Sequence, residues 1–398
     1  MLRFAFFFVP LMTGWLVVAS WFVLRARGAH RWLPNCARAT VGNASVSLDR
    51  DVHLLLCIAD HFEPWENQRV SAETARARVE YWVREYPRRM SPFRDSDDRP
   101  PRHTFFFPVE DYDCDQVALL AQLCSAGYGE VEVHLHHEND TAESLRSKLS
   151  GFRDTLAHRH GLLSRHIHTG ALVYGFVHGN WALDNSHPDG AACGVNNELD
   201  VLRETGCYAD FTLPSAPSPT QTRKVNSLYY ALDDPRAPKS HDWGVDVGCG
   251  SAPAGSLMII QGPLLLNWQH RRRWLLPRLE NACIQASQPP SLDRLQLWLK
   301  ARIRVPSRPD WFFVKLHTHG AAEDQREAVI GEPMLTFHRD LARLAADNPH
   351  FHFHYVSARE MYNLIRAAES GWQGTVAEAR DFELARNTIA TSAGATNT

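Results

Sequence analysis

The chain has 398 residues, of which 44% are hydrophobic and 22% charged, a composition typical of a globular protein with a substantial buried core. The formal net charge is −3 and no basic stripe is interleaved with aromatic residues, which argues against a nucleic-acid-binding protein. The eight cysteines include no C-x-x-C pair, which excludes a zinc ribbon and a thioredoxin motif.

The N-terminal segment differs in composition from the rest of the chain. Phe4–Leu24 runs for 21 residues without a charge, and about 20 apolar residues are enough to cross a bilayer as a helix. A cleaved signal peptide is the alternative, but its apolar region is normally about 7–15 residues long behind a basic start. Only Arg3 precedes this segment. We therefore predict an uncleaved transmembrane anchor over residues 1–24 and a single-pass protein of the inner (cytoplasmic) membrane.

The residues after this segment predict the orientation and the domain organisation. Four arginines lie in a basic, polar linker at residues 25–48, and the positive-inside rule then favours a cytoplasmic position for the following domain. We place the globular domain at residues 49–370. The small and polar residues of 371–398 predict a tail that is partly disordered.

Short apolar runs alternate with helical patterns throughout the globular domain. The runs are rich in β-branched and aromatic residues and are bounded by Gly, Pro or Asp, as strands are. Strands are predicted at 52–60, 103–110, 130–137, 170–178, 207–213, 256–266, 311–319 and 351–357. Helices are predicted at 71–86, 115–126, 141–160, 196–204, 333–346 and 358–369.

This alternation predicts an α/β fold with a parallel sheet covered on both faces. Seven or eight strand–helix units predict a distorted (β/α)7-type barrel, preceded by the single transmembrane helix. In such barrels the chemistry lies at the C-terminal ends of the strands. Asp60, the histidines of 134–137, His178 and the pair at 317–319 all fall at predicted strand ends. We therefore expect these side chains to share one rim.

The segment Asp60-His61-Phe62-Glu63 directly follows the first predicted strand. A carboxylate and an imidazole at a strand end can bind a divalent metal or act as acid and base. The alternative is a turn, because aspartate commonly ends strands and caps helices.

The segment His134-Leu135-His136-His137 ends the third predicted strand. His134 and His136 share one face because strand side chains alternate, so their imidazoles can converge on one metal. His137 points the other way unless the strand has already ended. The alternative is a polar edge strand with surface histidines.

Two further segments supply candidate residues at strand ends. His317 and His319 share a face and suit a general acid or further metal ligands. His178 is followed by Asn180, Trp181 and Asp184, which are candidates for substrate binding or for shaping the loop. His352 and His354 alternate on the last predicted strand, and we interpret them as packing or rim residues.

The pattern resembles the polysaccharide deacetylase family of carbohydrate esterases, over roughly residues 50–365 and through short motifs only. The family has an Asp-Asp pair after its first strand, and Asp60-His61 stands at that place here. Its second motif has two histidines four residues apart, and here His134 is followed at that spacing by Glu138. Its late Leu-x-His motif is matched by the segment around His317, or by a variant that ends at His319.

The resemblance implies a distorted barrel and a metal held by one aspartate and two histidines, which polarises an acetamide carbonyl and activates water. By position, Asp60 would be a metal ligand or the general base. If Asp60 is the base, His61 would be a metal ligand. His134 would be a ligand, with His136 or His137 the second one. Glu63 or water would act as base if Asp60 is a ligand. His317 would be the acid, with His319 the alternative.

Together these features predict a metal-dependent hydrolase that removes N-acetyl groups from a polysaccharide or lipid-linked oligosaccharide, in cell-envelope or exopolysaccharide metabolism. The expected cofactor is a divalent metal ion, zinc in the first instance, and the expected substrate-binding residues include Glu63. One alternative is a catalytically inactive glycan-binding relative. A second is another barrel-type glycoside hydrolase, which would need two facing carboxylates, with Glu63, Asp184 and Asp210 as candidates.

Overall fold

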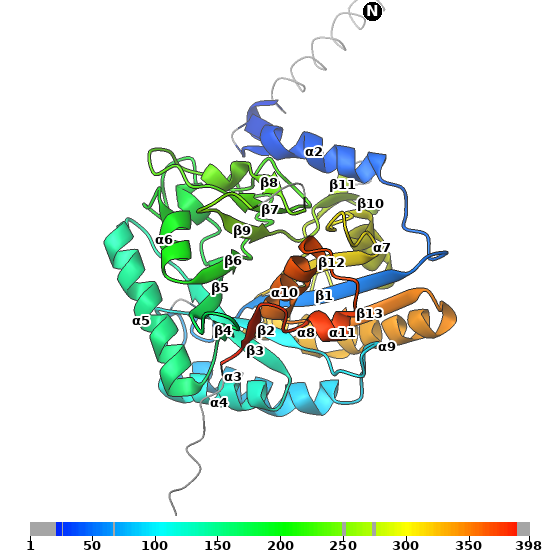
Figure 1. Ribbon diagram of the computed structural model, residues 1–398, viewed down its shortest axis with the longest axis horizontal. Helices are drawn as coiled ribbons and strands as arrows, with labels where there is room; N and C mark the ends of the chain where they lie inside the picture. The colour runs from blue at the N-terminus through cyan, green and yellow to red at the C-terminus, as the bar shows by residue number, and fades with distance from the viewer. Residues whose placement is uncertain (1–20, 26, 67, 249–251, 273–275, 388–398) are drawn as a thin grey trace, which may run out of the picture.

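A 12-stranded, mostly parallel sheet forms the centre of the protein (Figure 1). The structure is a computed structural model that describes residues 21–25, 27–66, 68–248, 252–272 and 276–387. The strands of this sheet are β1 (Val52–His61), β2 (His103–Pro108), β3 (Gly129–Leu135), β4 (Ser164–His166), β5 (Leu172–His178), β6 (Cys207–Asp210), β7 (Leu228–Ala231), β8 (Val245–Asp246), β9 (Leu257–Ile260), β12 (Trp311–Thr318), β13 (Phe351–Tyr355) and β14 (Leu384–Arg386). Their main order is β12-β1-β2-β3-β5-β6-β9-β7-β8, with β13 also beside β1, and with β4 between β5 and β14. A separate hairpin pairs β10 (Leu265–Arg272) with β11 (Leu276–Glu280).

The helices start and end where local sequence signals allow. Ser71 caps α3 by accepting the N–H of Thr74, and Ser357 with Glu360 forms a capping box at the start of α10. The helices are α2 (Ala29–Gly42), α3 (Ala72–Met90), α4 (Cys114–Ser125), α5 (Ala142–His160), α6 (Glu198–Glu204), α7 (Leu292–Lys300), α8 (Glu323–Ile330), α9 (Glu332–Asp347), α10 (Ala358–Glu369) and α11 (Val376–Ala379). All six predicted helices and seven of the eight predicted strands are confirmed, with boundaries shifted by a few residues. The eighth predicted strand, 256–266, is divided between β9 and the start of β10.

Both faces of the sheet are buried, as the continuous apolar run of β1 predicts. Alternate residues of β1 enter two different apolar clusters: Leu54, Leu56 and Ile58 enter one, and Leu55, Cys57 and Ala59 enter the other. The first cluster contains Trp82 of α3, and the second contains Leu364 of α10. Residue 60 therefore continues the α3 side of the sheet, and residue 61 continues the α10 side.

The predicted distorted (β/α)7-type barrel is wrong, since the described strands form an open sheet and no closed barrel. A segment around Cys283 occupies the outer edge of β12: the N–H of His317 donates to the carbonyl of Ala282 at 3.0 Å, and the N–H of Ile284 donates to that of His317 at 2.8 Å. At the other end, β7 and β8 extend the sheet in antiparallel fashion. Each edge of the sheet is thus extended by a neighbouring segment, and in the described part of the chain the two edges do not pair with each other.

The structure does not support the predicted transmembrane helix or, with it, the single-pass position in the inner membrane. Within the described ranges, no helix is both long enough and apolar enough to cross a bilayer. Residues 4–20 of the predicted span Phe4–Leu24 lie outside the described residues. The first helix described in full, α2, contains a proline and is amphipathic. It buries Trp32 and Cys36 in a small cluster with Leu264.

The ordered domain is longer at both ends than the range 49–370. Helix α2 lies within the segment 25–48 that was predicted as a linker, and it packs beside β10 and β11 (Figure 1). After residue 370, α11 forms and β14 pairs in antiparallel fashion with β4. Of the predicted tail 371–398, the last 11 residues lie outside the described part.

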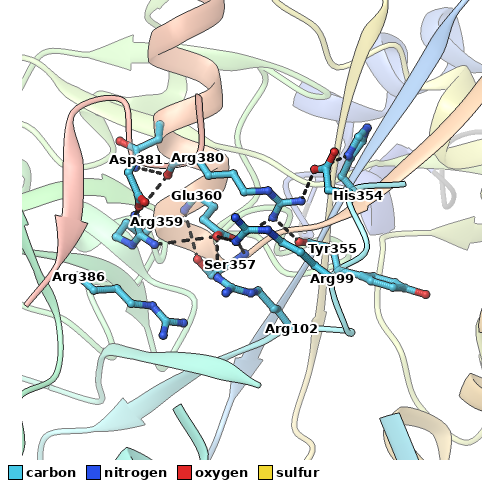
Figure 2. Close-up of polar contacts among 12 residues, drawn as sticks. Arg99, Arg102, His354, Tyr355, Ser357, Arg359, Glu360, Arg380, Asp381 and Arg386 are labelled. Atoms are coloured by element: carbon cyan, nitrogen blue, oxygen red, sulfur yellow. Dashed lines mark hydrogen bonds and ion pairs between the residues drawn. The ribbon is translucent and has the colours of Figure 1, made fainter. Parts of the chain in front are cut away.

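A buried network of charged side chains fastens these C-terminal residues to the sheet (Figure 2). Arg359 of α10 contacts Glu130 of β3 at 2.8 Å (Nη2 to Oε1), and Arg386 of β14 contacts the same oxygen through Nε at 2.9 Å. Arg380 is 1% exposed and lies 2.8 Å from Asp97. Charged groups are buried only when paired, so these pairs hold the C-terminal segment in one position.

Candidate metal centre

The carboxyl end of β1 separates Asp60 from His61, because successive strand residues point to opposite faces. Asp60 is completely buried on the α3 side. One of its carboxylate oxygens accepts the N–H of Gly320 at 2.7 Å, and the other lies 2.8 Å from Nε2 of His103. Among the described residues, no group that could hold a metal includes Asp60. This residue, predicted as ligand or base, therefore holds the loop after β12 instead.

His61 lies among aromatic side chains from three other segments. Its ring centroid is 5.0 Å from that of His134, 4.8 Å from that of His319 and 4.6 Å from the Trp181 ring stacked on it. The side chain is completely buried, and within the described ranges neither ring nitrogen has a hydrogen-bond partner. Burial, reinforced by the neighbouring imidazoles, holds the pKa of His61 well below its ordinary value. His61 is therefore a neutral imidazole, and in the described part of the chain both of its ring nitrogens are unpaired.

Glu63 lies between the remaining histidines. Its Oε1 is 3.2 Å from Nε2 of His134, 3.7 Å from Nε2 of His136 and 3.8 Å from Nε2 of His319. Burial alone would raise the pKa of Glu63, but the surrounding histidines, His134 foremost, lower it to about 2. The carboxylate is therefore ionised at neutral pH. It suits a metal ligand better than a general base, whose pKa should lie near the working pH.

His136 pairs with Glu110 at the outer side of this cluster. Its Nδ1 contacts Oε1 of Glu110, and its backbone N–H donates to the same oxygen at 3.1 Å. Burial lowers the pKa of His136, but Glu110 and Glu63 outweigh burial and raise it above 6.5. An imidazole whose pKa is raised holds its proton more readily and can donate it to a neighbouring group. Sequence reasoning did not select Glu110, although it ends the predicted strand 103–110.

A cavity of about 290 Å³ opens over the cluster. Its lining includes His61, Glu63, Glu66, His319, Ala321, Ala322, Asp324 and Gln325. Arg78 of α3 braces its rim, with Nη2 at 2.9 Å from Glu66 and at 2.6 Å from Glu323. Larger cavities of about 410 and 550 Å³ lie elsewhere and contain none of the clustered histidines.

The two late histidines differ in their access to this cavity. The His319 side chain is 32% exposed and lines it. His317 is buried, and the Trp181 ring packs edge-on to it with centroids 5.0 Å apart. Of the two residues predicted as acid, His319 is therefore the one that a substrate in the cavity can touch.

The donor atoms of the cluster fit a divalent metal ion. Two overlapping groups, His61/Glu63/His319 and Glu63/His134/His136, each bring three ligand atoms within 4.8 Å of one another. Imidazole nitrogens and a carboxylate oxygen are donors that zinc accepts. The unpaired nitrogens of His61 give a second reason, because a buried polar ring without partners is costly unless something binds it.

Two predicted site residues belong to a separate buried group. His137 and His178 lie beside Cys193 and Glu198, and the His137 ring packs against that of His178 with centroids 4.6 Å apart. Sequence reasoning did not select Cys193 or Glu198 because both lie outside the predicted strand ends.

The other predicted substrate-binding residues take different positions. Trp181 covers His61, whereas Asn180 donates its side-chain N–H to the carbonyl of His137 at 3.2 Å. Asp184 is completely buried. This burial, together with the nearby charge of Asp233, raises the pKa of Asp184 to about 8. Asp210 is also buried and accepts the Thr212 hydroxyl at 2.7 Å. Neither aspartate lines the cavity above Glu63, so the facing carboxylates of a glycosidase are not formed by these residues.

In comparisons with known proteins, no family and no curated protein matches this chain. The chemistry open to the site follows from its own geometry: an ionised carboxylate, several neutral imidazoles, one imidazole of raised pKa and an open cavity above them. Such an arrangement can hold a divalent ion with a free position and move a proton beside it.

Proposed function

We propose that this chain is a metal-dependent hydrolase that removes N-acetyl groups from a polysaccharide or oligosaccharide, with zinc as its metal. The observation that carries the proposal is His61, a buried imidazole with two unpaired nitrogens beside an ionised carboxylate at the floor of a cavity. Catalytic zinc sites combine such donors with one position left for water or substrate. The motifs that resemble polysaccharide deacetylases support the choice of substrate class.

The roles of the residues follow from their positions. A bound divalent metal would polarise the amide carbonyl and lower the pKa of water. His61 and Glu63, with His134 or His319, would hold it. His136, paired with Glu110, would carry a proton at its Nε2 atom. Trp181 shields the floor of the site from water through its stacking on His61.

The first test measures acetate release and metal content together. The full chain is freed of metal with a chelator and assayed with a panel of N-acetylated oligosaccharides, before and after adding Zn²⁺. We expect acetate only when metal is present, and we expect Glu63→Gln to reduce both metal content and turnover. His352→Ala on β13 is the control and should leave both unchanged. Glycan binding without acetate release, whichever divalent metal is added, would identify a binding protein instead.

The two late histidines should respond differently to removal. His319 lines the cavity, so His319→Ala should lower kcat by about 10²–10⁴, the usual contribution of a positioned acid or base. His317 is buried under Trp181, so His317→Ala should act mainly on stability, by about 1–3 kcal/mol. Initial rates and thermal melting curves of both variants separate the two effects. Equal kcat for His319→Ala and wild type would remove His319 from the proposed mechanism.

A further inference from the structure

A second group of metal-type ligands lies outside the site described above. It consists of His137 just after β3, His178 at the end of β5, Cys193 in the following loop, and Glu198 at the start of α6. All four residues are buried, and their ligand atoms lie within 4.8 Å of one another. The cavity above Glu63 includes none of them. A site with four protein ligands and no open position is the arrangement of structural zinc sites.

The separations between these atoms are those of ligands around one ion. Metal–ligand distances of about 2.0–2.3 Å place the corners of a tetrahedron about 3.3–3.8 Å apart. Oε1 of Glu198 lies 3.1 Å from Nε2 of His137 and 3.8 Å from Nε2 of His178. Oε2 of the same carboxylate lies 3.3 Å from Sγ of Cys193. These separations therefore lie in or near the range expected for ligands of one ion.

The hydrogen bonds around the group also suit a metal. Nε2 of His178 has no hydrogen-bond partner in the described part of the chain. Its Nδ1 accepts the backbone N–H of Asn180 at 3.2 Å, a hydrogen bond that metal binding at Nε2 would replace. Sγ of Cys193 accepts two backbone N–H groups, those of Asn185 at 3.3 Å and Val195 at 3.5 Å. Burial first and the Glu198 carboxylate second raise the pKa of the Cys193 thiol, and these two N–H groups offset only part of that effect. A thiolate at this position therefore needs a bound cation beside it.

The loop between these ligands contains several residues in left-handed backbone conformations. In residues 179–197 four non-glycine residues adopt left-handed φ values: Trp181 (60°), Asp184 (52°), Asn185 (50°) and Ala192 (66°). Such backbone conformations are strained, and they persist only where the surrounding structure determines them. The same loop brings Gly179 against the His136 ring and Trp181 onto His61. Whatever fixes this loop therefore also shapes the site around Glu63.

We propose that His137, His178, Cys193 and Glu198 bind a second metal ion of the zinc class, which is structural and fixes the loop that carries Trp181 over His61. Binding replaces the Cys193 S–H bond by a metal–sulfur bond, and the thiol proton leaves to solvent. When Nε2 of His178 binds the metal, the proton of this ring moves to Nδ1. The hydrogen bond that Nδ1 accepts from the Asn180 N–H is then lost.

Cobalt substitution tests this centre without depending on catalysis. The metal-free full chain is titrated with Co²⁺, and the thiolate-to-cobalt charge-transfer absorption in the near ultraviolet is recorded. The centre around Glu63 contains no sulfur ligand, so this band reports only on a cysteine-containing site. We expect wild type to bind two cobalt ions per chain and to show the band. Wild type without the band at saturating Co²⁺ would overturn the proposal, and this result requires no variant to fold.

Three variants assign the band to its site. Cys193→Ser should abolish the band and lower the bound metal from two ions to one, whereas Cys207→Ser, at another buried cysteine, should retain both. Persistence of the band in folded Cys193→Ser would equally overturn the proposal. Glu63→Gln should lose one ion and keep the band. The structural centre can therefore be confirmed even if no acetate is released and the proposed activity fails.

Discussion

Replacement of His61 by alanine is expected to remove the metal from the centre around Glu63 and to lower acetate release by about 100-fold or more. The loss of metal-assisted stabilisation amounts to several kcal/mol, and about 1.36 kcal/mol corresponds to a factor of ten in rate. Within the described ranges the His61 nitrogens form no hydrogen bond, so no existing bond is broken by the change. Metal analysis and initial rates of the purified variant check the expectation.

Asp60 gives a matched control because it is the preceding residue of the same strand and faces the other way. Asp60→Ala should retain the metal but lose thermal stability, since it leaves His103 and the N–H of Gly320 without their buried acceptor. If Asp60→Ala loses the metal while His61→Ala keeps it, the centre proposed here is wrong. The assignment of Asp60 implied by the deacetylase motif would then be right.

Replacement of Glu130 by glutamine is expected to lower the free energy of unfolding by about 3–5 kcal/mol, the usual cost of removing one partner from a buried ion pair. The side chain is buried and accepts from Arg359, Arg386 and the Ser357 hydroxyl. Glutamine preserves the volume but leaves the Arg359 guanidinium without this counter-charge. Urea unfolding followed by far-UV circular dichroism measures the change.

The pH dependence of the free energy of unfolding of Glu130→Gln is an independent measure of the same ion pairs. Burial alone would raise the pKa of Glu130, but Arg359 and Arg386 outweigh it and hold the pKa below its ordinary value. The stabilisation is therefore present above about pH 4.3, the pKa of an unfolded glutamate, and is lost as the pH falls below it. We expect the variant to lose less stability than wild type on acidification. Glu80→Gln, in an exposed pair with Arg76, should change stability by less than about 1 kcal/mol.

Local patterns in the sequence located six helices and the eight predicted strand positions, but not the helices α2, α7, α8 and α11 or the strands β4, β7, β8, β11 and β14. The 3.6- and 2-residue periodicities, the caps and the turn residues are properties of neighbouring residues, which no distant contact has to supply. Strand alternation also predicted that His134 and His136 would share a face, and their rings lie beside each other with centroids 4.7 Å apart, although β3 ends at Leu135. The family motif, in contrast, pointed to Asp60, which the geometry leaves outside the cluster.

The tertiary structure decided the features that depend on contacts between distant segments. The sheet stays open because the segment around Cys283 occupies the edge of β12, a pairing over more than 30 residues that no local pattern encodes. The face of β1 that packs on α3 determines that His61, and not Asp60, meets the other histidines. Cys193 and Glu198 join His137 and His178 only because a loop folds back across two strand ends. Residue type and spacing therefore determined which chemical groups were available, and long-range packing determined which of them meet.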